Sequence, residues 1–190
     1  MQQLIKQVID QAAANLSASL DVFYPAYGRN GLNERNLSYQ LAKVFETQNN
    51  AAHAFMEVPF INPDTERYEH RIDCMLLDTE TVAFVECKRL YSPEKAEQLR
   101  LDFERMNVQN LIPILDNFVG SHRIARKVYR VMLTETWQKL TVDWWVARDN
   151  SRSWNNDWLP EERGVVEVKT FENGNTLYWL YAVELIESAL

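Results

Sequence analysis

The chain has 190 residues, 46% of them hydrophobic, and a formal net charge of -7. This length allows one domain with a sizeable core and excludes two large domains, so we expect a single domain over residues 1–190. The acidic balance argues against a protein that coats nucleic acid through bulk positive charge, because phosphate binding depends on clustered Lys and Arg. Any nucleic-acid surface must therefore be local.

No stretch approaches the roughly 18–20 apolar residues of a membrane helix, and the first 20 residues lack the apolar core of a secretory signal. The two cysteines, Cys74 and Cys87, have neither metal-ligand spacing nor a disulfide framework. We expect both to be reduced core residues. Together these features predict a soluble, cytoplasmic protein that does not enter a membrane.

Apolar residues at helical spacing predict an N-terminal helix over residues 2–19 with one buried stripe. A second helix is expected from about Asn33, an acceptable N-cap residue, to Thr47. Glu34 falls on the apolar stripe of this helix, one turn before Leu37. Its carboxylate is therefore expected to point toward the core.

Three runs rich in β-branched, aromatic and apolar residues follow, at residues 55–60, 67–78 and 81–90. They predict a β-meander. The second and third runs are joined so tightly that they should pair as an antiparallel hairpin with Thr79 and Glu80 in the turn.

The sequence Ser92-Pro93-Glu94 combines an N-cap, a Pro at the first helical position and an acid in the first turn. It predicts a helix to about Met106, whereas residues 107–120 favour no single structure. A further helix is expected from Ser121 to about Lys139, with an apolar face formed by Ile124, Val128, Val131 and Met132.

The rest of the chain is expected to form strands, first over residues 141–147 and then over 164–171 and 176–185. Asn173-Gly174 is a strong hairpin turn signal and predicts a C-terminal β-hairpin at about 164–185. We interpret the tryptophans between residues 144 and 158 mainly as packing residues, although base stacking is an alternative.

Three polar residues in the central hairpin form the candidate active site. With Thr79-Glu80 as the turn, Asp73 lies opposite Glu86, and alternation places Lys88 on the same face. The hairpin is otherwise apolar on both faces, so these charges are imposed on a buried strand pair. Buried carboxylates without a partner are costly and often mark functional sites.

The charges of this group indicate a cation. Two carboxylates at about 4 Å repel by on the order of 4 kcal/mol at an effective dielectric of about 20. Lys88 supplies one positive charge against Asp73, Glu86 and Glu34, and the remaining deficit matches one divalent ion. Oxygen ligands suit Mg²⁺ or Mn²⁺ better than zinc, and such an ion can activate water for attack on a phosphate.

The order of these residues resembles the PD-(D/E)XK, or restriction endonuclease-like, superfamily. A helix bearing Glu34 is followed by Arg71-Ile72-Asp73 in one strand, by Phe84-Val85-Glu86-Cys87-Lys88 in the next, and then by a helix. The resemblance covers about residues 30–107, with Ile72 at the position of the Pro that names the motif. The pattern of RecB-like members is not present.

The resemblance implies an α/β fold with a mixed central β-sheet flanked by helices. Its restriction endonuclease-like core would span about residues 30–147, with the C-terminal strands as additions. It implies a Mg²⁺-dependent nuclease that hydrolyses phosphodiester bonds in DNA, with Asp73 and Glu86 as metal ligands and Lys88 as a catalytic residue. The carbonyl of Cys87 would be a further ligand, and Glu34 would be the carboxylate contributed by a helix.

Two alternatives remain open. A second Glu-x-Lys, Glu167-Val168-Lys169, lacks a paired strand bearing an Asp on the matching face, so we favour the set around Asp73. The chain could also be a nuclease fold without activity that serves as a nucleic-acid-binding or assembly module.

The expected partner is DNA. On the helix expected after Ser121, basic residues recur at spacings of three and four and form a stripe that could contact phosphates or could simply be solvated. The residues of this stripe are Arg123, Arg126, Lys127 and Arg130. A homodimer is a further possibility, because two-fold symmetric DNA would favour one.

Overall fold

The computed structural model describes residues 2–22, 33–48, 50–61, 68–119, 126–147 and 154–187. Within these ranges the helices are α1 (Gln2–Val22), α2 (Arg35–Phe45), α3 (Pro93–Arg105), α4 (Val108–Val119) and α5 (Lys139–Val146). The strands are β1 (His53–Ile61), β2 (Tyr68–Leu77), β3 (Thr81–Arg89), β4 (Lys127–Thr136), β5 (Arg163–Thr170) and β6 (Thr176–Glu187). None of the helices in this part of the chain is long and apolar enough to cross a membrane.

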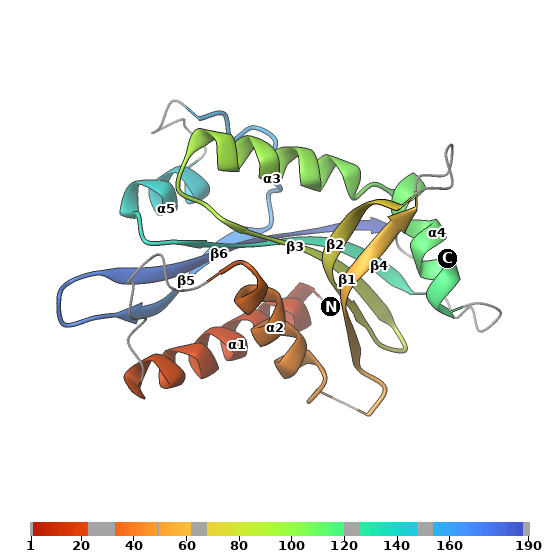
Figure 1. Ribbon diagram of the computed structural model, residues 1–190, viewed down its shortest axis with the longest axis horizontal. Coiled ribbons are helices and arrows are strands. Elements are labelled where there is room, and N and C mark those ends of the chain that lie inside the picture. Colours follow the sequence, from red (N-terminus) through yellow and green to blue (C-terminus); the bar gives the residue numbers. More distant parts are fainter. Residues whose placement is uncertain are drawn as a thin grey trace.

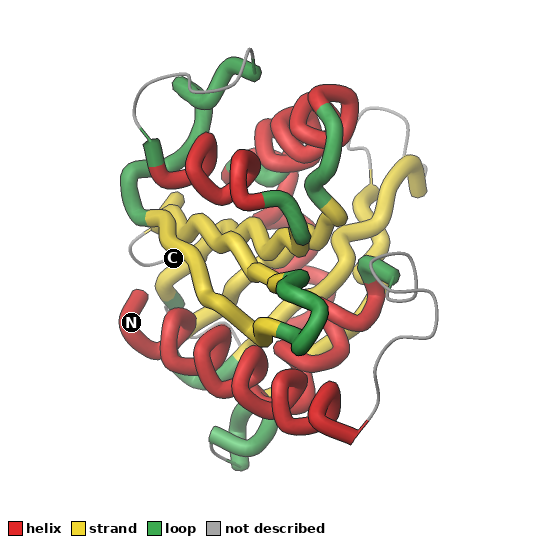
Figure 2. The backbone as a smooth tube through the Cα atoms, turned by 90° about the vertical axis from the view of Figure 1, so that its left-hand side faces the viewer, coloured by secondary structure: helices red, strands yellow, loops and turns green. Residues whose placement is uncertain are grey.

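The strands form one six-stranded mixed sheet in the order β1-β2-β3-β4-β6-β5. β3 and β4 are parallel, and the other neighbouring strands are antiparallel. A parallel pair needs a crossover connection, which α3 and α4 provide here. The predicted α/β fold with a mixed central sheet flanked by helices is therefore confirmed (Figures 1 and 2).

Helices cover both faces of the sheet, and each face has its own hydrophobic core. α1 and α2 lie on one face, while α3 and α5 lie on the other (Figure 1). Cys74, Val85 and Cys87 belong to the core on the α1–α2 side. Met75 and Phe84, their neighbours in sequence, belong to the core on the α3 side. The strands between these cores are apolar on both faces because both faces are covered.

Several local predictions are confirmed. The N-terminal helix, the three-stranded meander and the C-terminal hairpin are all present. Ser92 caps α3 by accepting a hydrogen bond from the Lys95 N–H. In the C-terminal turn Gly174 has a φ of +78°, a conformation that Gly adopts without steric cost. Both cysteines are free and buried.

The helix predicted from Ser121 to Lys139 is wrong, because residues 127–136 form β4. Val128 and Val131 are each 0% exposed at the centre of the sheet, between β3 and β6. Such a strand is buried on both faces and reads as a nearly continuous apolar run, which cannot be distinguished from a buried helix by periodicity alone. Ser121 and Ile124 lie outside the described residues.

The strand predicted at residues 141–147 is also wrong, since this segment forms α5. Thr141, Val142, Trp144 and Trp145 are all buried, a spacing of one, three and four residues that matches a helix face and not strict alternation. The undecided segment 107–120 contains α4, which includes Pro113. The expectation that the tryptophans pack is confirmed for Trp144 and Trp145, which are 0% exposed.

Candidate active site

The β2–β3 hairpin has the register predicted from its short turn. Asp78 donates its backbone N–H to the carbonyl of Thr81 at 2.9 Å. The pairing then runs from Leu77 opposite Val82 to Cys74 opposite Val85, where it ends. Asp73 and Glu86 are the next residues along, so they lie where the two strands separate.

Asp73 occupies the gap that opens between these strands. Its Oδ2 accepts a hydrogen bond from the backbone N–H of Cys87 at 2.7 Å, which replaces a bond of the strand ladder. The alternation of β2 changes here, because Ile72 and Met75, three residues apart, pack in the same core. Glu57 of β1, which the register places opposite Asp73, has a φ of +54°. The local distortion of both strands thus directs Asp73 toward β3.

Glu86 is a buried carboxyl in direct contact with Asp73. Its exposed fraction is 7%. Burial, and then the negative charge of Asp73, raise the pKa of Glu86 to about 9. Burial also raises the pKa of Asp73, while the Cys87 N–H and Glu86 oppose that rise. Two buried carboxyl groups in contact cannot easily be ionised at the same time unless a cation binds between them.

The ammonium group of Lys88 is paired with an acidic side chain of α3. Its Nζ forms an ion pair with Oδ2 of Asp102 on α3 at 2.8 Å, and Arg105 binds the other oxygen of Asp102. Asp102 is only 9% exposed. The sequence prediction did not include Asp102, although its position on the buried stripe of α3, three residues after Leu99, is a usable signal.

Glu34 reaches the same edge of β3 from the start of α2. Its Oε1 accepts a hydrogen bond from the backbone N–H of Arg89 at 3.0 Å. The N–H groups of Cys87 and Arg89 both point toward the side of β3 that no longer pairs with β2. Asp73 accepts from the Cys87 N–H, and Glu34 accepts from the Arg89 N–H. Because a strand residue projects its N–H and C=O to the same side, the Cys87 carbonyl also faces this gap, along the edge between the two carboxylates.

When all its carboxyl groups are ionised, this group has a charge deficit that a cation would offset. Four carboxyl groups, from Glu34, Asp73, Glu86 and Asp102, are set against Lys88, Arg105 and Arg71, which lines the same small pocket as Glu86. A small pocket of about 10 Å³ beside Glu86 has room for roughly one water molecule. Within the described residues, no three His, Cys, Asp or Glu side chains already form a metal-binding group. The oxygen donors suit a hard divalent ion, and side-chain adjustment would be needed to bring a third carboxylate to it.

The predicted basic stripe does not exist as a helical face, since β4 replaces the helix. Arg126 is 9% exposed and donates to the carbonyl of Asp78 at 2.7 Å. Arg130 pairs with Glu184 and lies over the ring of Phe103. Lys127 is exposed, while Arg123 lies outside the described residues. Two of the four basic residues thus make contacts within the fold.

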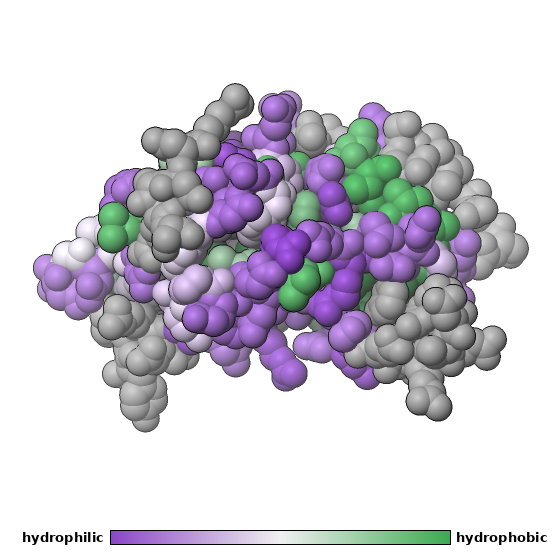
Figure 3. All heavy atoms as spheres, turned by 90° about the horizontal axis from the view of Figure 1, so that it is seen from above, coloured by the Kyte–Doolittle hydropathy of each residue, from purple (hydrophilic) through white to green (hydrophobic). Residues whose placement is uncertain are grey.

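The basic side chains of the α3 face are held in two ways, and Lys95 donates to the neutral side chain of Gln98 at 3.1 Å. Arg100 forms ion pairs with Glu97 and Glu104 of the same helix. This face is mostly hydrophilic, and its apolar atoms gather toward the end of the molecule where α4 lies (Figure 3). Binding to a polyanion at this face would depend on Lys95 and on Arg100 released from its ion pairs.

The second Glu-x-Lys lies on β5, an edge strand that is separated from β3 by β4 and β6. Glu167 is exposed and accepts a hydrogen bond from Thr170, and Lys169 pairs with Asp21 of α1. Glu167 therefore provides a control position for experiments on Glu86.

Comparison with known proteins does not assign the chain to a family. No protein-family model matches it, and neither a curated protein nor a solved structure matches it.

Proposed function

We propose that this chain is a divalent-metal-dependent nuclease of the PD-(D/E)XK type that hydrolyses phosphodiester bonds in DNA. The observation that carries the proposal is the buried, mutually interacting pair Asp73 and Glu86 beside Lys88, at the point where β2 and β3 separate. Perturbed carboxyls of this kind concentrate at functional sites. The element order α2, β1, the β2–β3 hairpin and α3 is compatible with the order on which the resemblance rests, and it supports the proposal of a restriction endonuclease-like core.

Asp73 and Glu86 would hold Mg²⁺ or Mn²⁺, with the Cys87 carbonyl and Glu34 as further oxygen donors at the same edge of β3. A divalent ion supplies there a Lewis acid for the phosphate and a water of lowered pKa. Glu86 has a raised pKa and must give up its proton for this role, so metal binding and proton release are coupled.

Lys88 would place a positive charge beside the scissile phosphate, where negative charge grows in the transition state. Asp102 positions the ammonium group through the 2.8 Å ion pair, and Arg105 holds Asp102. Asp102 is thus a positioning residue for Lys88.

A cleavage assay tests the proposal. Plasmid and single-stranded DNA are incubated with Mg²⁺, Mn²⁺ or EDTA and with wild type, Asp73→Asn or Lys88→Met. We expect cleavage by the wild type that needs the metal and is lost in both variants, while Glu167→Gln on the edge strand keeps it. Cleavage that persists in Asp73→Asn and Lys88→Met would remove the site assignment.

A second candidate function is a nucleic-acid-binding or assembly module with the same fold and no catalysis. It is favoured by the Lys88–Asp102 ion pair, which offsets the positive charge of Lys88, and by the raised pKa of Glu86, which keeps that carboxyl protonated at neutral pH without a cation. This module would retain DNA in a salt-sensitive way that is indifferent to Asp73→Asn and would cut no substrate.

A further inference from the structure

A second pocket lies at the C-terminal ends of the parallel strands β3 and β4, next to Glu34 of the carboxyl group described above. Its volume is about 340 Å³, within the range of small-ligand sites. The seven residues that line it are Arg89, Leu90, Tyr91, Glu135, Thr136, Trp137 and Gln138. Because Lys88 and Arg89 are consecutive on β3, this pocket and the candidate active site share one end of that strand.

The floor of this pocket contains a buried carboxyl that is incompletely satisfied. Glu135 is 3% exposed, and its Oε1 has no hydrogen-bond partner. Nε of Arg89 lies 3.7 Å from that oxygen, which is an ion pair but not a hydrogen bond. A buried acceptor in this state is costly, and a ligand with N–H donors would satisfy it.

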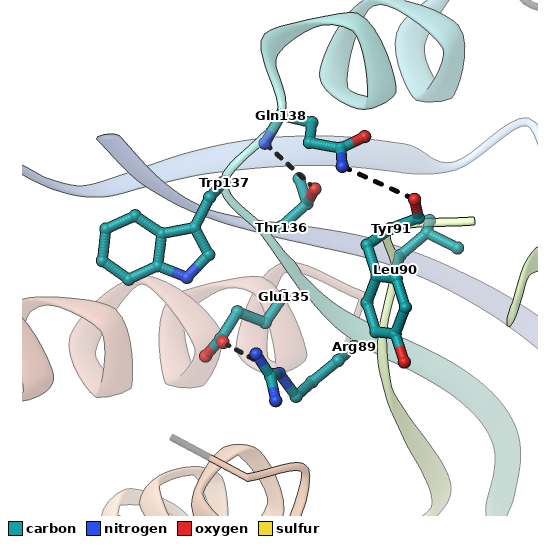
Figure 4. Close-up of a pocket in the computed structure, with 7 residues that line it drawn as sticks. All are labelled: Arg89, Leu90, Tyr91, Glu135, Thr136, Trp137 and Gln138. Atoms are coloured by element: carbon teal, nitrogen blue, oxygen red, sulfur yellow. Dashed lines mark hydrogen bonds and ion pairs between the residues drawn. The ribbon is translucent and has the colours of Figure 1, made fainter. Parts of the chain in front are cut away.

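Aromatic rings flank this carboxyl. The indole of Trp137 and the phenol of Tyr91 lie on two sides, with Glu135 and Arg89 between them (Figure 4). Trp137 is held by a stacked contact with Phe171, at 5.6 Å between ring centroids. Its buried indole Nε1–H is close enough to Glu135 to lower the pKa of that carboxyl, but it makes no hydrogen bond of good geometry. Tyr91 is 50% exposed, so the pocket opens to solvent beside this ring.

We propose that this pocket binds an unpaired guanine base of the DNA strand, an inference that rests on the proposed nuclease function and specifies its substrate. Guanine carries two adjacent N–H donors that match the two oxygens of a carboxylate, and a neighbouring carbonyl that can accept from an indole N–H. Adenine, cytosine and thymine do not offer two adjacent donor positions on this edge. The edge is accessible only when the base is unpaired, and aromatic side chains commonly hold such bases by stacking.

The binding test uses the four deoxynucleoside monophosphates, titrated by calorimetry into the full chain. We expect dGMP to bind roughly tenfold or more tightly than dAMP, dCMP or dTMP, because a bidentate contact discriminates to this extent. Glu135→Gln should abolish the preference, and Tyr91→Ala should weaken dGMP by roughly tenfold. Glu167→Gln, a matched change of an exposed carboxylate, should leave dGMP binding unaltered.

Equal affinities for the four nucleotides, no binding, a guanine preference that survives Glu135→Gln, or dGMP binding that Tyr91→Ala leaves unaltered would overturn the proposal. If Glu135→Gln does not fold, Tyr91→Ala decides alone, since its exposed ring can be removed without opening the core. Asp73→Asn separates this inference from the proposed function, because it should abolish cleavage and keep dGMP binding. Metal-dependent cleavage by a protein that does not bind dGMP preferentially would reject only the proposed guanine pocket. Preferential dGMP binding by a protein that cleaves no DNA would reject only the proposed nuclease function.

Discussion

The carboxylate of Asp73 binds the backbone N–H of Cys87 at the position where β2 has left β3. The Asp73 carboxylate thereby takes the place of the hydrogen-bond acceptor that a paired strand would supply. Glu34 does the same two residues farther along, where it accepts from the Arg89 N–H. The proposed metal ligands therefore also complete the hydrogen bonding of the part of β3 that no longer pairs with β2.

Asp73→Asn should separate these two roles. The Asn side-chain carbonyl can still accept from the Cys87 N–H, so the fold is expected to remain, whereas the negative charge for a metal is lost. We expect DNA cleavage to fall by about 100-fold or more with little change in the melting temperature. Asp73→Ala should lose both activity and stability, because it leaves the Cys87 N–H without its partner. Equal melting temperatures for the two variants would contradict the structural role.

Asp102→Ala should destabilise the protein through Lys88. Breaking one side of a buried ion pair leaves an uncompensated charge and costs about 3 kcal/mol in the free energy of unfolding, which urea denaturation measures. The double variant Asp102→Leu with Lys88→Met should recover much of this loss, because it removes both buried charges together and leaves only Arg105, whose side chain is 41% exposed, without its Asp102 partner. If the single and double variants are equally unstable, packing and not charge is responsible.

The stability of the metal-free protein should fall as the pH rises. The pKa of Glu86 is raised to about 9, so the folded state binds a proton that the unfolded state releases above a pKa near 4.5. This contribution is fully present below about pH 4.5 and is lost as the pH rises through about 9. In EDTA, Glu86→Gln should therefore show a smaller decline in melting temperature between pH 6 and 9 than the wild type.

Two comparisons sharpen this pH test. Burial raises the pKa of Glu135 to about 7, so this residue also makes the stability fall as the pH rises. The variant Glu135→Gln measures its contribution to the decline. Mg²⁺ should stabilise the wild type more at pH 8.5 than at pH 6, because binding displaces the Glu86 proton. An equal effect of Mg²⁺ at both pH values would argue against Glu86 as a ligand.

Glu57 offers a test of the distortion beside Asp73. Its φ of +54° costs a non-Gly residue on the order of 1 kcal/mol, which Gly avoids. Glu57→Gly should therefore have a free energy of unfolding about 1 kcal/mol higher than Glu57→Ala, which removes the same side-chain contacts. A more stable Ala variant would show that this conformation is not maintained in solution.

Arg126→Ala should lower stability by about 1–3 kcal/mol, since it removes the buried hydrogen bond to the Asp78 carbonyl at the hairpin turn. Lys127→Ala changes an exposed residue and should leave stability unaltered while weakening DNA retention at low salt. Thermal denaturation and filter binding on both variants measure these effects. A stable Arg126→Ala that loses DNA would instead restore Arg126 as a phosphate contact.

The hairpin could be predicted from the sequence because its two-residue turn and apolar strands allow one register. Its consequence at Asp73 could not, because strict alternation does not reveal that β2 leaves β3 after Cys74. The sequence around Val128 predicts a helix because Val128, Val131 and Met132 recur at helical spacing after a possible cap at Ser121, whereas the burial of these residues arises from β3 and β6, which are distant in sequence. The ion pair between Lys88 and Asp102 could not be predicted for a similar reason, because the two residues come into contact only through the packing of α3 on the sheet.

Direct measurement of metal binding tests the central claim. Free Mn²⁺ is followed by its electron paramagnetic resonance signal during titration of wild type, Asp73→Asn, Glu86→Gln and Glu167→Gln, with and without a DNA oligonucleotide. We predict that wild type and Glu167→Gln remove Mn²⁺ from solution with the same affinity, and that Asp73→Asn and Glu86→Gln lose this binding. Equal binding by all four proteins, or no binding by the wild type even with DNA, would contradict the assignment of Asp73 and Glu86 as a metal site.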